Sequence, residues 1–255
     1  MISLRSPNGL GDAIYLRAIV LHLVARGEEV TVFTKWKDVF SDLPVAVREV
    51  IDITPNDRPT YVYCPAERVI PEGLSDFVIR CRSAGIKERV ELKLDWKVKN
   101  QALLDQIKRD ARGRKIFIYQ CARAIRSPIS ALLKPRREAF NKFIERHADH
   151  YRIKLGHPPH VEDDPGAPCE LDLFGKAFIF GTFDVCTIGD IFFGQASFIN
   201  CIAEALDKPH ITMFARAALA SPHPRANSAT PERVFAKKHL ATAVYDDAEA
   251  GACAS

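Results

Sequence analysis

The chain has 255 residues, of which 47% are hydrophobic and 27% are charged, a composition typical of a soluble globular protein. No stretch approaches about eighteen uncharged apolar residues, so the sequence predicts no membrane span. The formal net charge of +4 suits an anionic ligand but does not require nucleic acid as a partner.

Cysteine usage and the first residues bear on the compartment. The seven cysteines are scattered and form no C-x-x-C pair. Residue 1 leads directly into a strand rather than into a basic and then apolar leader, so secretion is not expected. Both features favour reduced thiols in the cytoplasm. Four cysteines are expected to be small core residues rather than metal ligands: Cys64, Cys121, Cys186 and Cys201.

The first half of the chain alternates short apolar runs with amphipathic stretches. The apolar runs predict strands and the amphipathic stretches predict helices. Strands are expected at residues 2–6, 29–33, 49–53, 60–64 and 76–81, and helices at residues 12–26, 36–41 and 97–112.

The second half restarts the same pattern after residue 114. Strands are expected at residues 115–120, 151–155, 184–188 and 210–214, and helices at residues 135–149, 197–206 and 231–248; residues 156–168 are expected to be a surface loop. This alternation predicts an α/β fold with two Rossmann-like domains facing a central cleft. Residues 1–113 would form the first domain, residues 114–230 the second, and residues 231–255 a terminal helix and frayed tail. One continuous sheet is the alternative.

The loop after the first strand, Asn8-Gly9-Leu10-Gly11-Asp12, is the first candidate site. Its two glycines allow a sharp turn, and Asp12 stands where the next helix begins. Open α/β sheets bind ligands at this position. A dinucleotide fingerprint is not expected, because Ile14 replaces the third glycine and Thr34-Lys35 stand where a ribose-binding acid is required. The sequence also contains no P-loop motif.

Leu10-Gly11-Asp12, followed by an apolar helix, a strand and Thr34-Lys35, resembles the start of the heptosyltransferase family of lipopolysaccharide synthesis. That family has the two-domain GT-B architecture. The second half carries three further likenesses to it. They are the basic loop and helix of residues 123–143 with Lys134-Pro-Arg-Arg, the segment Asp184 to Asp190, and the helix, Lys-Pro turn and strand of residues 202–214.

In the family an aspartate after this strand is followed by Ser/Thr-Gly and by a histidine on the helix. Aligning on the predicted strand makes Asp190 the match. Aligning on the helix instead matches Ser197, and then Ala196 occupies the acid position and Cys201 the histidine position. The two alignments differ by the six residues 191–196, and both stay open.

The resemblance implies a role for each candidate residue. Asp12 would be the base that deprotonates the acceptor, although a helix-capping role is the alternative. Arg123 and Lys134 would hold the diphosphate, unless they belong to a solvated basic loop. Ser197, with Gly194 before it, would offer a hydroxyl and helix N–H groups to phosphate, or be an ordinary N-cap. Asp190 would contact a sugar or ribose hydroxyl, or be a turn residue.

With these features, the resemblance implies an inverting glycosyltransferase that uses a nucleotide-diphosphate sugar, with no metal and no other cofactor. The acceptor would be a glycan or glycolipid. The eight histidines form no metal-ligand pattern, consistent with this expectation.

Two alternative functions remain. Basic clusters at residues 108–115 and 134–137, expected around the junction of the halves, would suit an enzyme that glycosylates a hydroxylated base in DNA. The altered residues Ala196 and Cys201 would suit a catalytically inactive nucleotide-binding protein of the same fold.

Overall fold

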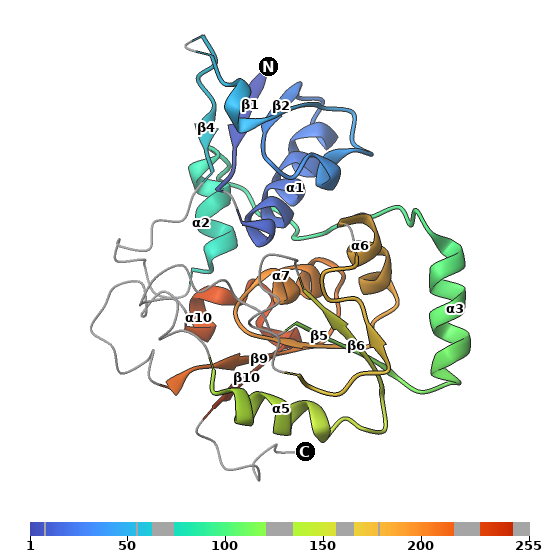
Figure 1. Cartoon of the computed structure of the whole chain (residues 1–255). Coiled ribbons are helices and arrows are strands. Elements are labelled where there is room, and N and C mark those ends of the chain that lie inside the picture. Colours follow the sequence, from blue (N-terminus) through green and yellow to red (C-terminus); the bar gives the residue numbers. More distant parts are fainter. Residues whose placement is uncertain are drawn as a thin grey trace.

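The computed structural model describes residues 1–7, 9–54, 56–62, 74–120, 135–156, 166–177, 179–216 and 230–246. They form two parallel sheets, one of four strands and one of six (Figure 1). The α/β class and the division into two sheets are as predicted. The predicted boundary at residue 113 lies between the last helix before the second sheet and that sheet's first strand.

The first lobe contains the four-stranded sheet, in the order β3-β2-β1-β4. Its pairs are all parallel, with Leu4 opposite Val32 on one side and Thr60 on the other. The strands are β1 (Ile2–Arg5), β2 (Val30–Phe33), β3 (Ala46–Arg48) and β4 (Thr60–Tyr61), and the helices are α1 (Leu10–Ala25), η1 (Lys37–Phe40), η2 (Val50–Asp52) and α2 (Asp76–Ser83).

The second lobe contains the six-stranded sheet, in the order β10-β9-β8-β5-β6-β7, with every pair parallel. Its strands are β5 (Ile116–Gln120), β6 (Tyr151–Leu155), β7 (Leu171–Asp172), β8 (Ile191–Gly194), β9 (His210–Phe214) and β10 (Ala241–Tyr245). Its helices are α5 (Arg137–Glu145), α6 (Ile179–Thr187), α7 (Phe198–Ala205), α10 (Pro231–Val234) and η4 (Lys238–Leu240), and α3 (Gln101–Ala111) precedes them in the chain.

Helix α1 is apolar on almost every side, and this explains its position. Nine of its residues are buried. A helix that is apolar all round is stable only when it is covered on all sides. One side of α1 packs on the first sheet, and its beginning packs on α7 of the second lobe. Gly27, with φ of 79°, provides the left-handed turn that ends this helical segment.

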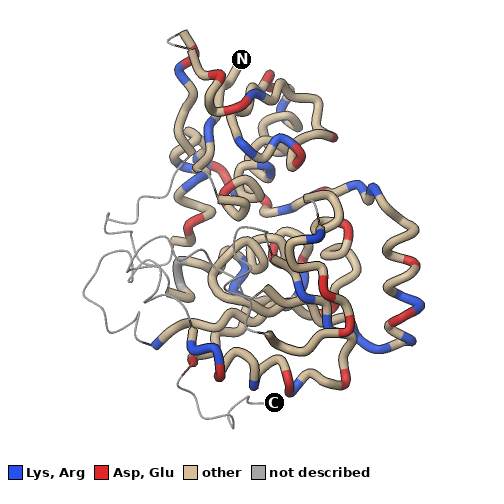
Figure 2. Tube along the Cα trace, in the orientation of Figure 1, with Lys and Arg blue, Asp and Glu red and all other residues tan. Residues whose placement is uncertain are grey.

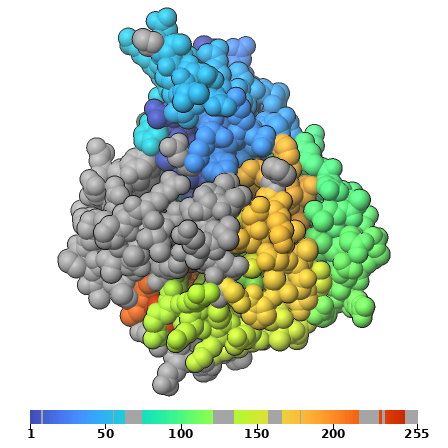
Figure 3. Space-filling view, in the orientation of Figure 1, coloured from blue at the N-terminus to red at the C-terminus, as the bar shows by residue number. Residues whose placement is uncertain are grey.

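Hydrophobic packing joins the two lobes. A single cluster of buried side chains runs from Leu4 and Ile19 of the first lobe to Phe192 and Ile202 of the second. A smaller aromatic cluster, including Phe117, lies under α5 on the opposite face of the second sheet. In the space-filling view the blue first lobe rests directly on the gold surface of the second (Figure 3).

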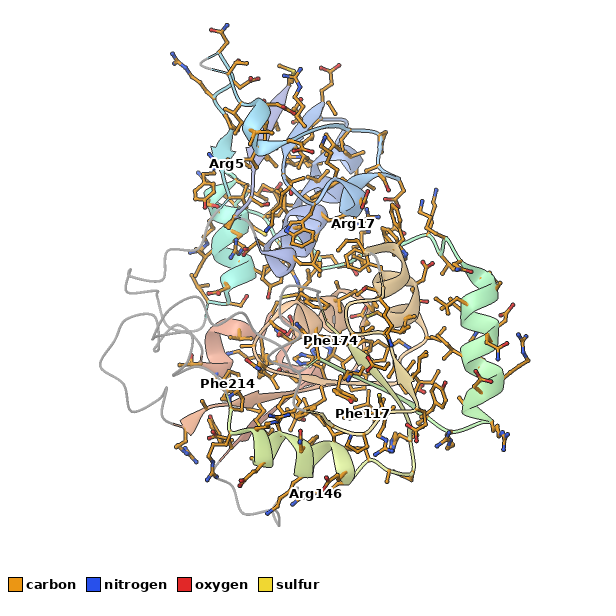
Figure 4. All side chains as sticks on the ribbon, viewed as in Figure 1. Arg5, Arg17, Phe117, Arg146, Phe174 and Phe214 are labelled. Carbon is orange, nitrogen blue, oxygen red and sulfur yellow. The ribbon has the colours of Figure 1, made fainter. Side chains whose placement is uncertain are left out.

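The linker between α2 and α3 is held by both lobes. The buried guanidinium of Arg17 in α1 donates to the carbonyl oxygens of Leu94 (2.5 Å) and Asp95 (2.8 Å). Figure 4 labels Arg17 near the lower side of the first lobe, above α6. The Leu94 N–H donates to the Ala205 carbonyl of α7 at 2.9 Å. The linker is therefore an ordered part of the junction.

Several predicted elements differ from the structure. Residues 76–81 were expected to be a strand but lie in α2, where the Ser75 hydroxyl caps the helix by accepting the Val78 N–H. The apolar run at residues 184–188 belongs to α6, and the strand before α7 is β8 instead. Short apolar runs suit a buried helix as well as a strand, and this ambiguity explains both errors.

Two further corrections concern chain segments near a sheet edge. Residues 49–53 were expected to be a strand, but β3 comes earlier and residues 50–52 form the short helix η2. Residues 231–248 were expected to be one helix, but Ala241–Tyr245 is the edge strand β10 paired with β9. Two β-branched residues, Thr242 and Val244, suit that strand. The other predicted elements are confirmed to within a few residues wherever the structure describes them.

Candidate functional site

Each sheet has one point where the strand order reverses direction, and candidate site residues lie at both points. In the first sheet the reversal falls between β1 and β4, and in the second between β5 and β8. At the carboxyl end of such a strand pair the two following loops diverge and leave a crevice, which is where open α/β sheets bind ligands. The sheet topology alone therefore indicates that the crevices at these two reversal points are the candidate site.

Asp12 lies at the reversal point of the first sheet, in the first turn of α1. One carboxylate oxygen, Oδ2, accepts the Gly9 N–H at 3.1 Å. The other, Oδ1, lies 2.5 Å from Nη2 of Arg80 in α2. The side chain remains 22% exposed, so solvent and a ligand can still reach it. The first turn of a helix favours this negative charge, because its N–H groups carry partial positive charge.

Ser197 lies at the reversal point of the second sheet, immediately before α7. Its hydroxyl donates to Oε1 of Gln120 at the end of β5, at 2.7 Å, and its N–H donates to Oδ1 of Asn200, also at 2.7 Å. Gly194 ends β8, where a Cβ would lie 2.8 Å from the Gln120 carbonyl oxygen. This close approach explains why only glycine fits there. The turn directs the first N–H groups of α7 toward the carboxyl edge of the sheet.

The two reversal points meet because α1 packs on α7. A Cβ built on Gly11 would lie 3.1 Å from Sγ of Cys201 and 3.5 Å from Cα of Phe198. The turn that carries Asp12 and the turn that carries Ser197 are therefore neighbours across the junction of the lobes. This places the predicted base of the first lobe beside the predicted phosphate-binding turn of the second.

Cys201 of α7 and Tyr15 of α1 are buried at this junction. Burial raises the pKa of the Cys201 thiol to about 12, and the charges of Glu204 and Asp12 add to the effect. Burial also raises the pKa of Tyr15, and the neighbouring Cys201 contributes in the same direction. Both groups stay protonated at neutral pH, so neither is an anionic nucleophile. The expectation that Cys186 and Cys201 are buried core residues is confirmed, whereas Cys64 and Cys121 lie outside the described residues.

The structure separates the two candidates Asp190 and Ser197. Asp190 precedes β8 and so lies at the amino edge of the second sheet, opposite the edge that carries Ser197. Its carboxylate accepts the Ile116 N–H at 2.8 Å, and its own N–H donates to the Ile116 carbonyl oxygen at 2.9 Å. The structure thus brings Asp12, Gly9, Gly11, Gly194 and Ser197 to the junction and does not bring Asp190 there.

Three predicted site residues, Asn8, Arg123 and Lys134, lie outside the described residues. The basic segment 108–115 was expected at the junction, but it runs from the end of α3 into the amino end of β5. That edge of the sheet is opposite Ser197. Figure 2 shows α3 at the margin of the molecule, with acidic and basic residues interspersed along it. The structure therefore does not gather these charges into a groove at the site.

Two residues of the site were not foreseen from the sequence. Arg80 was expected to lie on a strand and had no assigned role, although the Ser75-Asp76 pair is a helix-start signal that would have placed it on a helix. Gln120 was recognised only as the end of a buried strand. Its contact with Ser197 joins residues 77 positions apart, so no local pattern could have revealed it.

Within the ranges that the structure describes, no three His, Cys, Asp or Glu side chains are grouped to hold a metal ion. None of the helices in those ranges combines the length and the apolar character needed to cross a bilayer.

Solved structures of sugar transferases share this fold with the chain. E. coli ADP-heptose lps heptosyltransferase II superposes with a TM-score of 0.59 at 14% identity, covering 96% of this chain and 90% of that chain. The chain has the heptosyltransferase fold. A glycosyl transferase family 9 protein from Veillonella parvula DSM 2008 matches with a TM-score of 0.64 at 8% identity, over 95% of this chain and 85% of its own.

A third match is the E. coli heptosyltransferase WaaC with ADP, with a TM-score of 0.57 at 10% identity, covering 96% of this chain and 93% of that one. No family model and no curated protein matches the sequence itself. The heptosyltransferase-like, GT-B-like fold, predicted from Leu10-Gly11-Asp12 and the three likenesses in the second half, is thus confirmed at the level of the fold.

Proposed function

We propose that this protein is a glycosyltransferase that moves a sugar from a nucleotide-diphosphate donor to an acceptor hydroxyl, with inversion and without a metal ion. The observation that carries the proposal is the placement of Asp12 beside the Ser197 turn, each at the reversal point of its own sheet. A carboxylate next to the positive end of a helix provides both a base and an anion site, and these are the two groups that the transfer requires.

In the proposed reaction the acceptor hydroxyl loses its proton to Asp12 as its oxygen attacks the anomeric carbon of the donor sugar. The bond between that carbon and the diphosphate oxygen breaks, and the nucleoside diphosphate leaves with the bonding electron pair. The first-turn N–H groups of α7 stabilise the leaving charge. Arg123 and Lys134 are proposed to add cationic contacts to it. Attack opposite the leaving group inverts the anomeric centre.

Known structures guide the choice of donor to test. WaaC has been solved with ADP and with ADP-2-deoxy-2-fluoro heptose. An ADP-sugar is therefore the first donor class to test, followed by UDP-sugars and GDP-sugars. A glycan or glycolipid hydroxyl is the proposed acceptor. The DNA alternative loses the part of its support that came from the basic segment 108–115, because this segment lies at the amino edge of the second sheet.

The decisive experiment combines binding and turnover. Calorimetric titration with ADP, UDP and GDP identifies the nucleotide, and release of that nucleotide from its sugar donors measures turnover with water or an acceptor. Asp12→Asn should keep nucleotide affinity and lower turnover on the order of 10²- to 10⁴-fold, as expected for loss of a general base. Asp105→Asn on the exposed face of α3 is the matched control and should leave both unchanged.

The possible results separate the hypotheses. Undiminished turnover by Asp12→Asn would refute the assignment of the base. Nucleotide binding without turnover of any donor would favour an inactive nucleotide-binding protein of this fold. The anomeric configuration of the product, read by NMR, tests inversion independently of which residue is the base.

A further inference from the structure

Arg80 is a nearly buried arginine at the candidate site. Helix α2 carries it toward the reversal point of the first sheet, and its side chain is only 8% exposed. Its guanidinium donates to the Val62 carbonyl oxygen at 3.3 Å through Nη1 and lies 2.5 Å from Asp12 through Nη2. The group also lies 5.7 Å from the centre of the Tyr15 ring. Contacts from three sides hold the guanidinium in one place.

These contacts span the two chain segments that flank the reversal point. Val62 directly follows β4, and Asp12 lies in the helix that follows β1. The planar guanidinium reaches both with two different nitrogens. A lysine ammonium has no such fork and cannot present two donors in a fixed plane. Arg80 therefore ties the end of β4 to the carboxylate at the start of α1.

The effect on Asp12 follows from how its two oxygens are used. Oδ2 accepts the Gly9 N–H and Oδ1 pairs with Arg80, so rotation of the carboxylate group is restrained at both oxygens. A carboxylate accepts about four hydrogen bonds in all. Each oxygen consequently keeps capacity to take a proton from an acceptor hydroxyl while its orientation stays fixed.

We infer that Arg80 is the positioning residue for the base Asp12, an inference that rests on the proposed function. It does not itself contact the reacting atoms. It holds the carboxylate in the orientation that proton transfer from the acceptor needs, and a misplacement of about 1 Å in such a group lowers the rate on the order of 10²-fold.

The test is the division of the kinetic effect between kcat and KM. Arg80→Gln should lower kcat for donor turnover on the order of 10²-fold, while KM and the affinity for the free nucleotide stay within about twofold. Arg80→Lys keeps the charge and should recover part of the loss. The control is Arg82→Gln, which removes the same charge from an exposed position on the same helix and should change neither kcat nor KM.

The double variant tests whether Arg80 acts through Asp12. In the Asp12→Asn background, Arg80→Gln should cause no further loss of kcat, because the carboxylate that Arg80 positions is already absent.

Contrary results are equally specific. An unchanged kcat, a loss confined to KM and nucleotide affinity, or an equal additional loss in the Asp12→Asn background would each overturn the positioning role. Thermal melts identify a variant that fails to fold, and Arg80→Lys then carries the test.

A spectroscopic measurement keeps this inference separate from the proposed function. The ¹³C signal of the Asp12 carboxyl carbon, assigned by its loss in Asp12→Asn, should move in Arg80→Gln and stay in place in Arg82→Gln. Absence of turnover by the wild-type protein would refute the proposed function, whereas an unmoved signal would refute the coupling of Arg80 to Asp12.

Discussion

Asp184 shows how much a single buried carboxylate contributes to the junction of the lobes. Its side chain is fully buried in α6 and accepts three N–H groups of the linker. The donors are Trp96 Nε1 at 2.8 Å, the Lys99 N–H at 3.0 Å and the Asn100 N–H at 2.7 Å. A buried charge is tolerated only when it is matched in this way. Trp96, packed edge-on against Phe183, therefore anchors the linker.

We expect Asp184→Asn to lower the free energy of unfolding by about 3 kcal/mol, because an amide NH₂ would face an N–H donor and leave it unsatisfied. Chemical denaturation of both proteins measures the difference. Asp105→Asn replaces an exposed carboxylate on α3 that accepts from Gln101, and its effect should stay within about 0.5 kcal/mol. Equal effects of the two substitutions would show that the buried hydrogen bonds are not the source of the stability.

The contact between α1 and α7 is the main feature at the scale of elements. Gly11 lets the two helices approach, since any Cβ there would press on Sγ of Cys201. The contact brings the positive ends of both helices to one place. Positive helix ends repel each other, and the carboxylate of Asp12 offsets this effect at the start of α1. The same residue is therefore suited to both the packing and the proposed chemistry.

Gly11→Ala tests this contact. Crowding of a packed interior lowers stability by about 1–3 kcal/mol, and we expect a loss in this range together with reduced donor turnover. Gly181→Ala in α6 is the control, because its Cβ would meet only the Ala177 side chain at 3.8 Å. That variant should be neutral or slightly stabilising, as for glycine-to-alanine changes within helices.

A second variant shows whether the steric explanation is right. Cys201→Ala removes the sulfur that the new methyl group would meet, so Gly11→Ala should be less destabilising in that background. Denaturation of the four proteins of this cycle gives the coupling between the two positions. Additive effects would rule out crowding between Gly11 and Cys201 as the cause.

At the scale of the molecule, ion pairs distributed over both lobes govern the response to acid. Asp42 in the first lobe is paired at both oxygens with the buried Arg17. Burial opposes ionisation of Asp42, but Arg17 outweighs it and keeps the pKa of that carboxyl below its ordinary value. Two carboxyl groups of the second lobe behave in the same way. Burial raises their pKa values, but Arg152 lowers the pKa of Glu170 and Lys154 lowers that of Asp172 by more.

These pKa values are lower in the folded than in the unfolded protein, where carboxyl groups have pKa values of about 4. As the pH falls, the unfolded chain binds protons first. The stabilisation is therefore complete above about pH 5 and is lost as the pH drops through the folded pKa values. Urea unfolding at pH 7, 5 and 3 measures this loss. Below about pH 4, the free energy of unfolding of Asp42→Asn should depend less on pH than that of Asp105→Asn. An equal dependence in the two variants would exclude the Asp42–Arg17 pair as a source of the acid sensitivity.

The sequence by itself determined the parallel α/β class, most of the strands and helices, and the loop that carries Asp12. These features are local, because an apolar run between turn residues specifies a strand, and two glycines before an acidic residue specify a tight turn into a helix. The exceptions were α2, α6, β10 and the segment of β3 and η2, where a short apolar run is compatible with either structure and only packing decides.

Only the tertiary structure decided which of these residues form a site. Asp12 and Arg80 are 68 positions apart, and Gln120 and Ser197 are 77 apart. Each pair meets because parallel strands separated in the chain become neighbours at the point where the strand order reverses. The same topology sends Asp190 to the amino edge and Ser197 to the carboxyl edge, although only seven positions separate them. A strand carries its two ends to opposite edges of a sheet, and nearness in sequence therefore does not predict nearness at the site.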